Sequence, residues 1–303
     1  MSLLSRTREI EELSCSDGSA GLLAAAEGSA VLAAADPAAV AEVAGYLTAS
    51  ADTGGVLTAR PGGGYLIAGK WDAVPAIARA GWFALAAEAD GDPTARALVL
   101  LSAAELTARP VPEPFGLVAA ETGEVVVDGI VVPAHRIVDL QAGIAAGFPL
   151  LSTRFPATAA VALGLARGGL GCFLDFARKR SRNGAIKPMI DDHTIQVELT
   201  RLVTGLRAAR HLLHDEIAGV GERMGTGQRV RIAAASWHAY RAARAVVEFA
   251  FEKSGGSALY DGSAIQRIWC DLSALDRLGI FGVAAERAIS LAQLGRYVTP
   301  GDI

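Results

Sequence analysis

The densest group of chemically capable side chains is a cationic run just past the middle of the chain. Arg178, Lys179, Arg180 and Arg182 fall within five positions, interrupted only by Ser181. Guanidinium groups in such a cluster can bind a phosphate or carboxylate through paired hydrogen bonds. The run also falls at the expected end of a helix, where cations are favourable against the helix dipole. Two interpretations stay open, an anion site and a structural helix end.

A second group combines two histidines with two carboxylates. His211, His214, Asp215 and Glu216 share one helical neighbourhood, and such side chains can ligate a metal ion. Carboxylate-rich metal sites in helical bundles draw further ligands from other helices, and no second Glu-x-x-His is present here. We therefore predict that the two histidines are structural or solvated and that the chain holds no metal.

Two short segments have the spacing of functional loops. The stretch from Gly64 to Lys70 is spaced like a phosphate-binding loop, but Trp71 stands where a magnesium-binding Ser or Thr is needed. We predict a β-hairpin strand there. The stretch from Ser254 to Ser257 lacks the strand-to-helix elbow of a nucleophilic serine, so it predicts a helix end followed by a loop.

The composition limits the functions that these residues can serve. Of the 303 residues 51% are hydrophobic and 20% are charged, and 28 Lys and Arg against 32 Asp and Glu give a formal net charge of −4. Such a chain can bury a large core, but it has no basic field for a nucleic-acid backbone. The most apolar stretch, Ala20 to Ala35, is cut by Glu27, so we predict no membrane-spanning helix.

The cysteines and the first residues bear on the compartment. Three widely separated cysteines support neither a disulfide framework nor a zinc site. The charged segment that begins the chain lacks the apolar core of a secretory signal, so we expect a cytoplasmic protein.

Hydrophobic periodicity divides the chain into three parts. Residues 1–52 read as a short helical segment, residues 53–145 as a β-domain of short strands separated by glycine turns, and residues 146–303 as a helical domain. In the third part apolar residues recur every three or four positions from Ile195 to Val220, which predicts a long helix. The expected fold is α+β, with a small β-domain followed by a C-terminal antiparallel four-helix bundle.

Four sequence strings resemble the acyl-CoA dehydrogenase superfamily, including its flavin-dependent monooxygenase branch. They run from Gly63 to Trp71, from Val125 to Arg136, from Asp175 to Gln196, and from Gly255 to Arg267. The resemblance covers nearly the whole chain from about Cys15. It implies a flavoprotein with FAD as cofactor and a shortened helical part before the β-domain.

The resemblance also implies which residues contact FAD. Arg180 would reach the flavin phosphate across a subunit interface. The other positions implied to bind the cofactor are Gln196, Gly255, Gly256 and Thr122. One departure concerns Pro75 and Ala76, which stand where the family has a Ser/Thr-Gly pair beside the flavin ring; proline has no N–H to donate there.

The catalytic base of the family is missing from its usual place. An acyl-CoA dehydrogenase needs a carboxylate to take the proton next to a thioester carbonyl, and the usual position falls near Gly279. The long helix offers Asp215, Glu216 and Glu222, of which Glu216 lies on the apolar side and is the preferred candidate. The histidine of the hydroxylase branch is also not visible after Asp271.

Three functions follow from the resemblance and its departures. The first is a flavin-dependent oxidoreductase acting on an acyl-CoA or related thioester. The second is a non-catalytic subunit or partner in a heteromeric acyl-CoA dehydrogenase, and the third is a flavin-free binding protein of the same fold. In each case we expect a homodimer, a homotetramer or a hetero-oligomer with a related subunit, because family members pack through their C-terminal helices.

Overall fold

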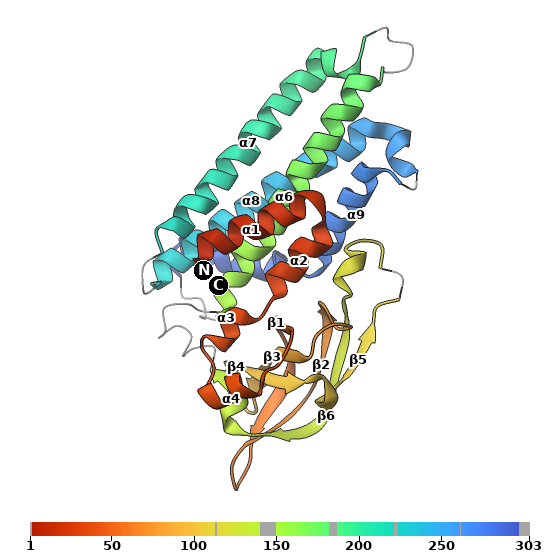
Figure 1. Ribbon diagram of the computed structural model, residues 1–303. Helices are drawn as coiled ribbons and strands as arrows, with labels where there is room; N and C mark the ends of the chain where they lie inside the picture. The colour runs from red at the N-terminus through yellow and green to blue at the C-terminus, as the bar shows by residue number, and fades with distance from the viewer. Residues whose placement is uncertain are drawn as a thin grey trace.

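The computed structural model describes residues 2–112, 114–139, 150–181, 187–220, 224–260 and 262–296. A β-sheet with short helices at its edge forms one end of the molecule, and long helices form the other (Figure 1). Arg182 of the cationic run and the candidate base Glu222 lie outside the described residues. The helices and strands have these bounds: α1 Leu3–Ser16, α2 Gly18–Ala26, α3 Ser29–Leu32, α4 Pro37–Glu42, β1 Leu47–Ala59, β2 Tyr65–Val74, β3 Trp82–Ala89, β4 Asp92–Ser102, β5 Thr107–Pro110, β6 Gly123–Val132, β7 Ile137–Asp139, α6 Leu150–Lys179, α7 His193–Ala218, α8 Thr226–Ser254, α9 Ala264–Arg277 and α10 Val283–Gln293.

The seven described strands form one mixed sheet in the order β5-β6-β2-β1-β3-β4-β7. Strands β1 and β3 pair in parallel, and the other neighbours pair antiparallel. Of the segment from Gly64 to Lys70, all residues after Gly64 lie in β2, so the expectation of a strand rather than a phosphate-binding loop is confirmed. Two buried clusters lie on the sheet, one around Trp71 and Phe83 and the other around Trp82 and Leu100.

Strand β1 begins at Leu47, before the predicted start of the β-domain at residue 53. Gly54 and Gly55 lie inside the strand because the indole of Trp71 packs against them: a Cβ added at Gly55 would approach Trp71 to 2.5 Å. The buried indole donates from Nε1 to the carbonyl oxygen of Ala86, 2.7 Å away. The glycines therefore mark a close approach of side chain to backbone rather than the end of a strand.

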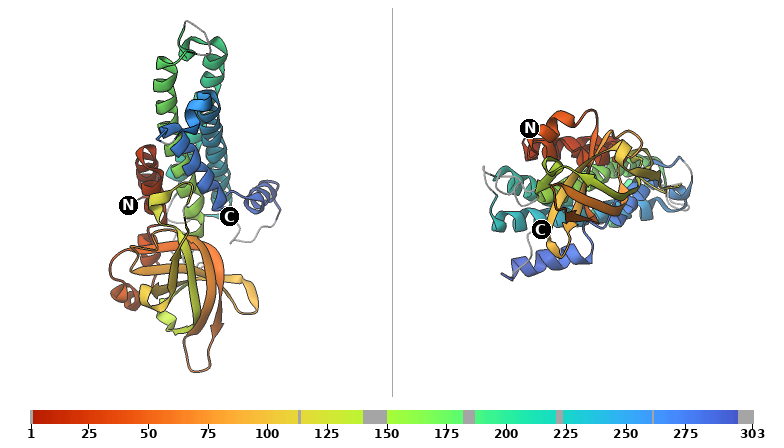
Figure 2. Two further views of the ribbon diagram at one scale, coloured as in Figure 1. Left: turned by 90° about the vertical axis from the view of Figure 1, so that its right-hand side faces the viewer. Right: turned by 90° about the horizontal axis from the view of Figure 1, so that it is seen from below.

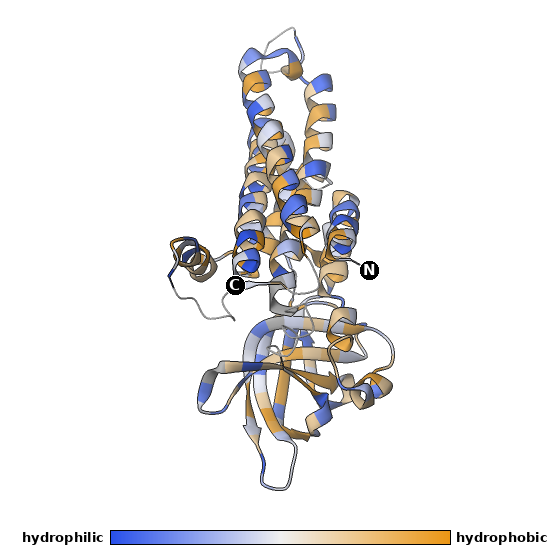
Figure 3. Cartoon of the chain, turned by 90° about the vertical axis from the view of Figure 1, so that its left-hand side faces the viewer, coloured by the Kyte–Doolittle hydropathy of each residue, from blue (hydrophilic) through white to orange (hydrophobic). Residues whose placement is uncertain are grey.

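The helical part contains more than the four expected long helices, because α1 and α2 pack against α6. Helix α8 packs against α6, α7 and α9 around a core of small and branched residues. In Figure 3 apolar residues gather between these helices, while polar residues line their outer sides. The coarse α+β class is thus observed; a strictly antiparallel four-helix bundle stays a prediction.

Gly279 and Gly282 predict a break in the last helical segment, and the structure divides the segment there. Helix α9 ends at Arg277 and α10 begins at Val283. Gly279 has φ +74°, a left-handed conformation that glycine adopts without steric cost. Helix α10 projects from the side of the helical part (Figure 2) and packs against α8.

Within α6, residues Thr153–Lys179 are long and apolar enough to cross a membrane by length and composition. The chain surrounds this helix with α1, α8 and α9, and 61% of its most apolar window is buried. Core helices of globular proteins meet the same criterion, so this helix is weak evidence for a membrane span.

Candidate functional site

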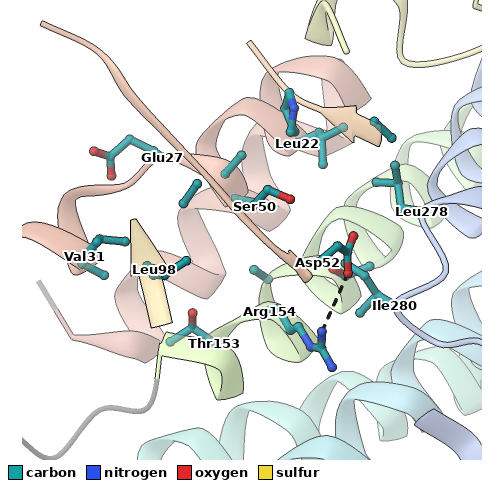
Figure 4. Close-up of a pocket in the computed structure, with 18 of the residues that line it drawn as sticks. Leu22, Glu27, Val31, Ser50, Asp52, Leu98, Thr153, Arg154, Leu278 and Ile280 are labelled. Carbon is teal, nitrogen blue, oxygen red and sulfur yellow. Dashed lines mark ion pairs between the residues drawn. The ribbon is translucent and has the colours of Figure 1, made fainter. Parts of the chain in front are cut away.

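A cavity of about 130 Å³ lies where the sheet meets the helices. Ala49, Ser50 and Asp52 on β1 form one wall, and Thr153, Arg154, Ala157 and Thr158 on the first turns of α6 form the opposite wall. Helix α2 and the α9–α10 connection close the remaining sides (Figure 4). The other lining residues are Arg6, Leu22, Ala25, Ala26, Glu27, Ala30, Val31, Ala73, Pro75, Leu98, Leu278 and Ile280.

One ion pair spans this cavity. Arg154 Nη1 lies 3.9 Å from Asp52 Oδ1 (Figure 4). The surrounding protein raises the pKa of Asp52, and the charge of Arg154 opposes that rise. Because 61% of the Asp52 side chain is exposed, water screens both effects and the carboxylate stands at the rim of the cavity. The guanidinium of Arg154 also lies 5.0 Å from the centre of the Phe155 ring.

Two residues in the cavity wall, both mostly buried, carry hydroxyl groups. They are Ser50, 8% exposed, and Thr158, 5% exposed. A hydroxyl group that lines a cavity can donate a hydrogen bond to a polar ligand or accept one from it.

The other carboxylate in the wall is occupied by structural contacts. Glu27 accepts hydrogen bonds from the backbone N–H and the hydroxyl of Ser29, at 2.9 and 2.6 Å. Its Oε2 also lies 3.6 Å from Arg6 Nη2. Asp52 is therefore the carboxylate in this wall that is available to a ligand.

The end of β2 is held in an unusual backbone conformation beside the cavity. Ala73 and Ala76 have φ of +55° and +60°, which is uncommon for residues with a Cβ. The hydroxyl of Thr48 donates to the carbonyl oxygen of Pro75 at 2.9 Å, and the N–H of Ala76 donates to the carbonyl oxygen of Ala120 at 2.8 Å. These bonds fix the segment where the family resemblance places a flavin contact, and Pro75 offers no N–H there.

Most residues that the resemblance implied to bind the cofactor gather at the opposite end of the helices. Arg180 is exposed just after α6, and Gln196 is exposed on the first turn of α7, where its Nε2 donates to the carbonyl oxygen of Ile190. Gly255 and Gly256 follow α8, as expected of a helix end. At 1.5 Å per residue, the 26 positions from Arg154 to Arg180 span about 39 Å along α6. These residues cannot reach the cavity of their own chain.

The candidate base Glu216 also lies away from the cavity. It is half-buried on α7 and pairs with Arg231, whose Nε lies 2.9 Å from Oε2. Asp215 and His211 are exposed, and His214 is buried beside Glu11 of α1. No group of three or more potential metal ligands occurs among the described residues.

Thr122 has a structural contact near the sheet. It is half-buried, and its carbonyl oxygen accepts a hydrogen bond from the N–H of Val111 at 3.1 Å. The segment before it is tied to α9, because Asp271 Oδ1 accepts from the N–H of Leu117 at 2.7 Å. Asp271, which the resemblance placed beside a catalytic position, thus anchors a loop.

Comparison with known proteins agrees with this architecture. Residues 157–278 match the family model described as acyl-CoA dehydrogenase, C-terminal domain. The match runs from within α6 to the end of α9. This part of the chain is therefore similar to that family, in agreement with the resemblance seen in the sequence.

Individual relatives belong to the monooxygenase branch. The chain is 25% identical over 248 residues to the oxygenase component of an FADH(2)-dependent resorcinol hydroxylase from Rhizobium sp. (strain MTP-10005), which covers 71% of this chain and 60% of the relative. It is 26% identical over 234 residues to HsaA, the oxygenase subunit of a flavin-dependent monooxygenase from Rhodococcus jostii (strain RHA1), with 70% and 61% covered. The chain thus spans about 60% of the length of these curated relatives.

One solved structure shows the same fold over almost all of the chain. The 3-HSA hydroxylase from Rhodococcus sp. RHA1 superposes with a TM-score of 0.88 at 21% identity, covering 99% of this chain and 84% of that one. The mixed sheet and the long helices of the present chain are therefore a known combination.

Sequence reasoning missed the residues that line the cavity. Asp52 and Arg154 are 102 positions apart and carry no shared motif, so their pairing follows from the fold alone. The sequence signal for this place was the resemblance itself, since it put Pro75 and Ala76 beside the flavin ring and Pro75 lines the cavity.

Proposed function

We propose that this chain is a flavin-dependent oxidoreductase of the monooxygenase type, the oxygenase component of a two-component system. In this proposal a reductase partner delivers reduced flavin, and the substrate is a small aromatic compound. The observation that carries the proposal is the set of polar groups in the cavity wall: the hydroxyls of Ser50 and Thr158 beside the Asp52–Arg154 pair. The relatives support the branch, and a cytoplasmic location remains part of the proposal.

The cavity residues fit the edge of a flavin ring. A flavin needs hydrogen-bond partners for its ring nitrogens and oxygens, together with apolar walls for its faces. Ser50 and Thr158 offer hydroxyls, and Ala49, Ala73 and Ala157 offer small apolar surfaces. A cavity of about 150 Å³ is known to hold one benzene ring, so this space of about 130 Å³ holds one ring of the flavin and the remainder extends outside it. In this proposal the cavity residues contact the flavin ring alone, so they accommodate FAD and FMN equally.

The ion pair at the rim supplies charge where the reaction needs it. When bound, a reduced flavin supplies the electrons and the oxygen chemistry. The guanidinium of Arg154 stabilises negative charge that develops on an oxygen at the rim. Asp52, the exposed carboxylate paired with Arg154, holds or accepts a proton there.

The cavity gives less support to an acyl-CoA thioester as substrate. Removal of a proton next to the thioester carbonyl needs a carboxylate inside the cavity. Glu27 is bound to Ser29 and Arg6, Asp52 is at the rim, and Glu216 pairs with Arg231 elsewhere. Hydroxylation of an aromatic ring involves no removal of a proton next to a thioester carbonyl.

The distance between the cavity and Arg180 favours a shared site. Arg180 lies about 39 Å from Arg154 along α6. Since Gln196, Gly255 and Gly256 lie at the same end of the helices, these residues would serve the flavin of a second copy. We therefore propose a homo-oligomer, a dimer or tetramer, in which one copy contributes the cavity and its neighbour the phosphate contacts.

The test is product formation with reduced flavin and oxygen. The purified chain, supplied with a flavin reductase, NADH and FAD or FMN, is incubated with a panel of phenols and, separately, with acyl-CoA esters and oxidised flavin. We expect a hydroxylated phenol. Asp52→Asn should change the pH profile of product formation, while the exposed neighbour Asp72→Asn should leave it unchanged.

Three results would reject the proposal in distinct ways. Bleaching of bound flavin by an acyl-CoA ester would make the chain a dehydrogenase. Flavin binding only with a related subunit would support a non-catalytic partner, and no flavin binding under any condition would support a flavin-free binding protein.

A further inference from the structure

A second polar site without an assigned role lies at the start of α8. Arg229 is 7% exposed, yet its Nε and Nη1 have no hydrogen-bond partner within the described ranges. Its Nη2 donates a long bond of 3.4 Å to the hydroxyl of Thr226. None of the ion pairs found among the described residues includes Arg229, although Arg231 two positions on pairs with Glu216.

An arginine in this state is energetically unfavourable. The guanidinium group stays charged in proteins, so it cannot avoid the cost of burial by losing its proton. A buried charge without a partner costs several kcal/mol. Burial alone lowers the pKa of Arg229. A lowered pKa is expected for a buried cation that has no negative charge beside it. A bound anion would remove this cost.

The backbone around Arg229 adds a second set of donors. Helix α8 is 29 residues long, and its N-cap, Gly225, provides no side chain to bind the first N–H groups. Such an N-terminus carries a partial positive charge and free donors. The bond to Thr226 shows that the guanidinium points back toward this first turn.

There is room at this end of the helix for a ligand. A Cβ added at Gly225 would have no heavy atom within 4 Å, and both Gly225 and Thr226 are exposed. The first turn of α8 is therefore open to a small anion from solvent, and Nη2 is the Arg229 atom that points to this turn.

We propose that Arg229 and the first turn of α8 bind an oxyanion, a carboxylate or phosphate group of a small molecule. One edge of the Arg229 guanidinium, Nε with Nη2 or Nη1 with Nη2, would donate to two oxygens of the anion, and the N–H groups at the start of α8 would donate to it from the other side. The residues of this site do not line the cavity between β1 and α6, so the proposal is independent of the flavin site.

Thermal unfolding of the whole chain tests the proposal with inorganic phosphate as the probe. Sodium chloride at matched ionic strength is the reference, and acetate tests a lone carboxylate. We expect the unfolding midpoint of the wild type to rise with phosphate, with acetate or with both. In Arg229→Met only the small general effect of phosphate on protein stability should remain. Arg231→Met, a neighbouring arginine that is 57% exposed, should respond like the wild type.

Calorimetric titration and ligand-free stability give two further readouts. Arg229→Met should weaken the affinity for the responding anion at least tenfold. Without ligand its midpoint should equal or exceed that of the wild type, because an unpaired buried charge is removed. If phosphate alone responds, the ligand carries a phosphoryl group; if acetate responds as strongly, it carries a carboxylate.

Three results would overturn the proposal. They are an equal response of wild type and Arg229→Met, no response to either anion, and a large loss of ligand-free stability in a folded Arg229→Met. If Arg229→Met does not fold, Gly225→Asp decides. Its tethered carboxylate would cap α8 and abolish the anion response, whereas an unchanged response would reject the site.

Discussion

Replacement of Glu11 should detach helix α1 from the long helices. The Glu11 side chain is 1% exposed on α1, and its Oε1 accepts from Arg210 Nε at 2.6 Å and from Arg167 Nη1 at 3.0 Å. His214 Nε2 lies 3.2 Å from the other oxygen, Oε2, without the alignment of a hydrogen bond. One carboxylate thus joins α1 to α6 and α7.

The size of the effect follows from the exposure of the partners. Removing one member of a buried charge pair costs 3–5 kcal/mol, roughly, because the other charges stay buried. The side chains of Arg167 and Arg210 are 37% and 34% exposed, so water can partly compensate them. We expect Glu11→Ala to lower the free energy of unfolding by about 3 kcal/mol, the lower end of that range.

Urea unfolding followed by circular dichroism measures this difference. The matched control is Glu12→Gln, because Glu12 also pairs with Arg167 but is 74% exposed; its effect should stay below about 0.5 kcal/mol. Equal effects of the two substitutions, or a loss below about 1 kcal/mol for Glu11→Ala, would refute the assignment of this contact as the attachment of α1.

Three further outcomes follow from the same structure. Burial raises the pKa of Glu11, but His214 and Arg210 lower it more, so the net pKa is below 4.5. The ionised Glu11 therefore stabilises the fold above pH 4.5, and this stabilisation is lost as the pH falls through the lowered pKa. The stability difference between wild type and Glu11→Gln should therefore shrink in acid, and a constant difference would contradict this. Asp271→Ala should cost about 1–3 kcal/mol in urea unfolding, because it leaves the buried N–H of Leu117 unpaired. Arg180→Ala should weaken flavin binding by about 1.5–3 kcal/mol in a fluorescence titration. Light scattering of the wild type should show a dimer or tetramer. An unchanged flavin affinity or a stable monomer would reject the shared site.

Local sequence signals predicted much of the fold. The glycines at 279 and 282 marked the break between α9 and α10, and the glycine pair after Ser254 marked the end of α8. Such signals are local, because they depend on the backbone freedom of single residues. The start of β1 was predicted too late because Gly54 was taken as a boundary. Gly54 instead lies inside β1, where the absence of a side chain leaves space for the indole of Trp71 on the next strand.

The candidate site was less predictable because it is assembled from distant segments. Asp52 and Arg154 are brought together by the packing of the sheet against α6, and Glu11 and Arg210 lie 199 positions apart. Neither pair has a spacing that periodicity or a motif can detect. Glu216 lay on the apolar side of its helix as expected, but the side of the helix does not determine which cavity a residue faces.

Flavin binding at the cavity between β1 and α6 is the measurement that tests the central claim most directly. The wild type is titrated anaerobically with reduced FAD and reduced FMN, beside two tryptophan variants on β1. Ala49→Trp would fill the cavity, whereas Val56→Trp lies on the same strand at a position that is 49% exposed. We predict that the wild type and Val56→Trp bind flavin alike and that Ala49→Trp binds at least about tenfold more weakly, a change of about 1.4 kcal/mol. Equal binding by both variants, or no binding of either flavin by the wild type, would contradict the assignment of this cavity.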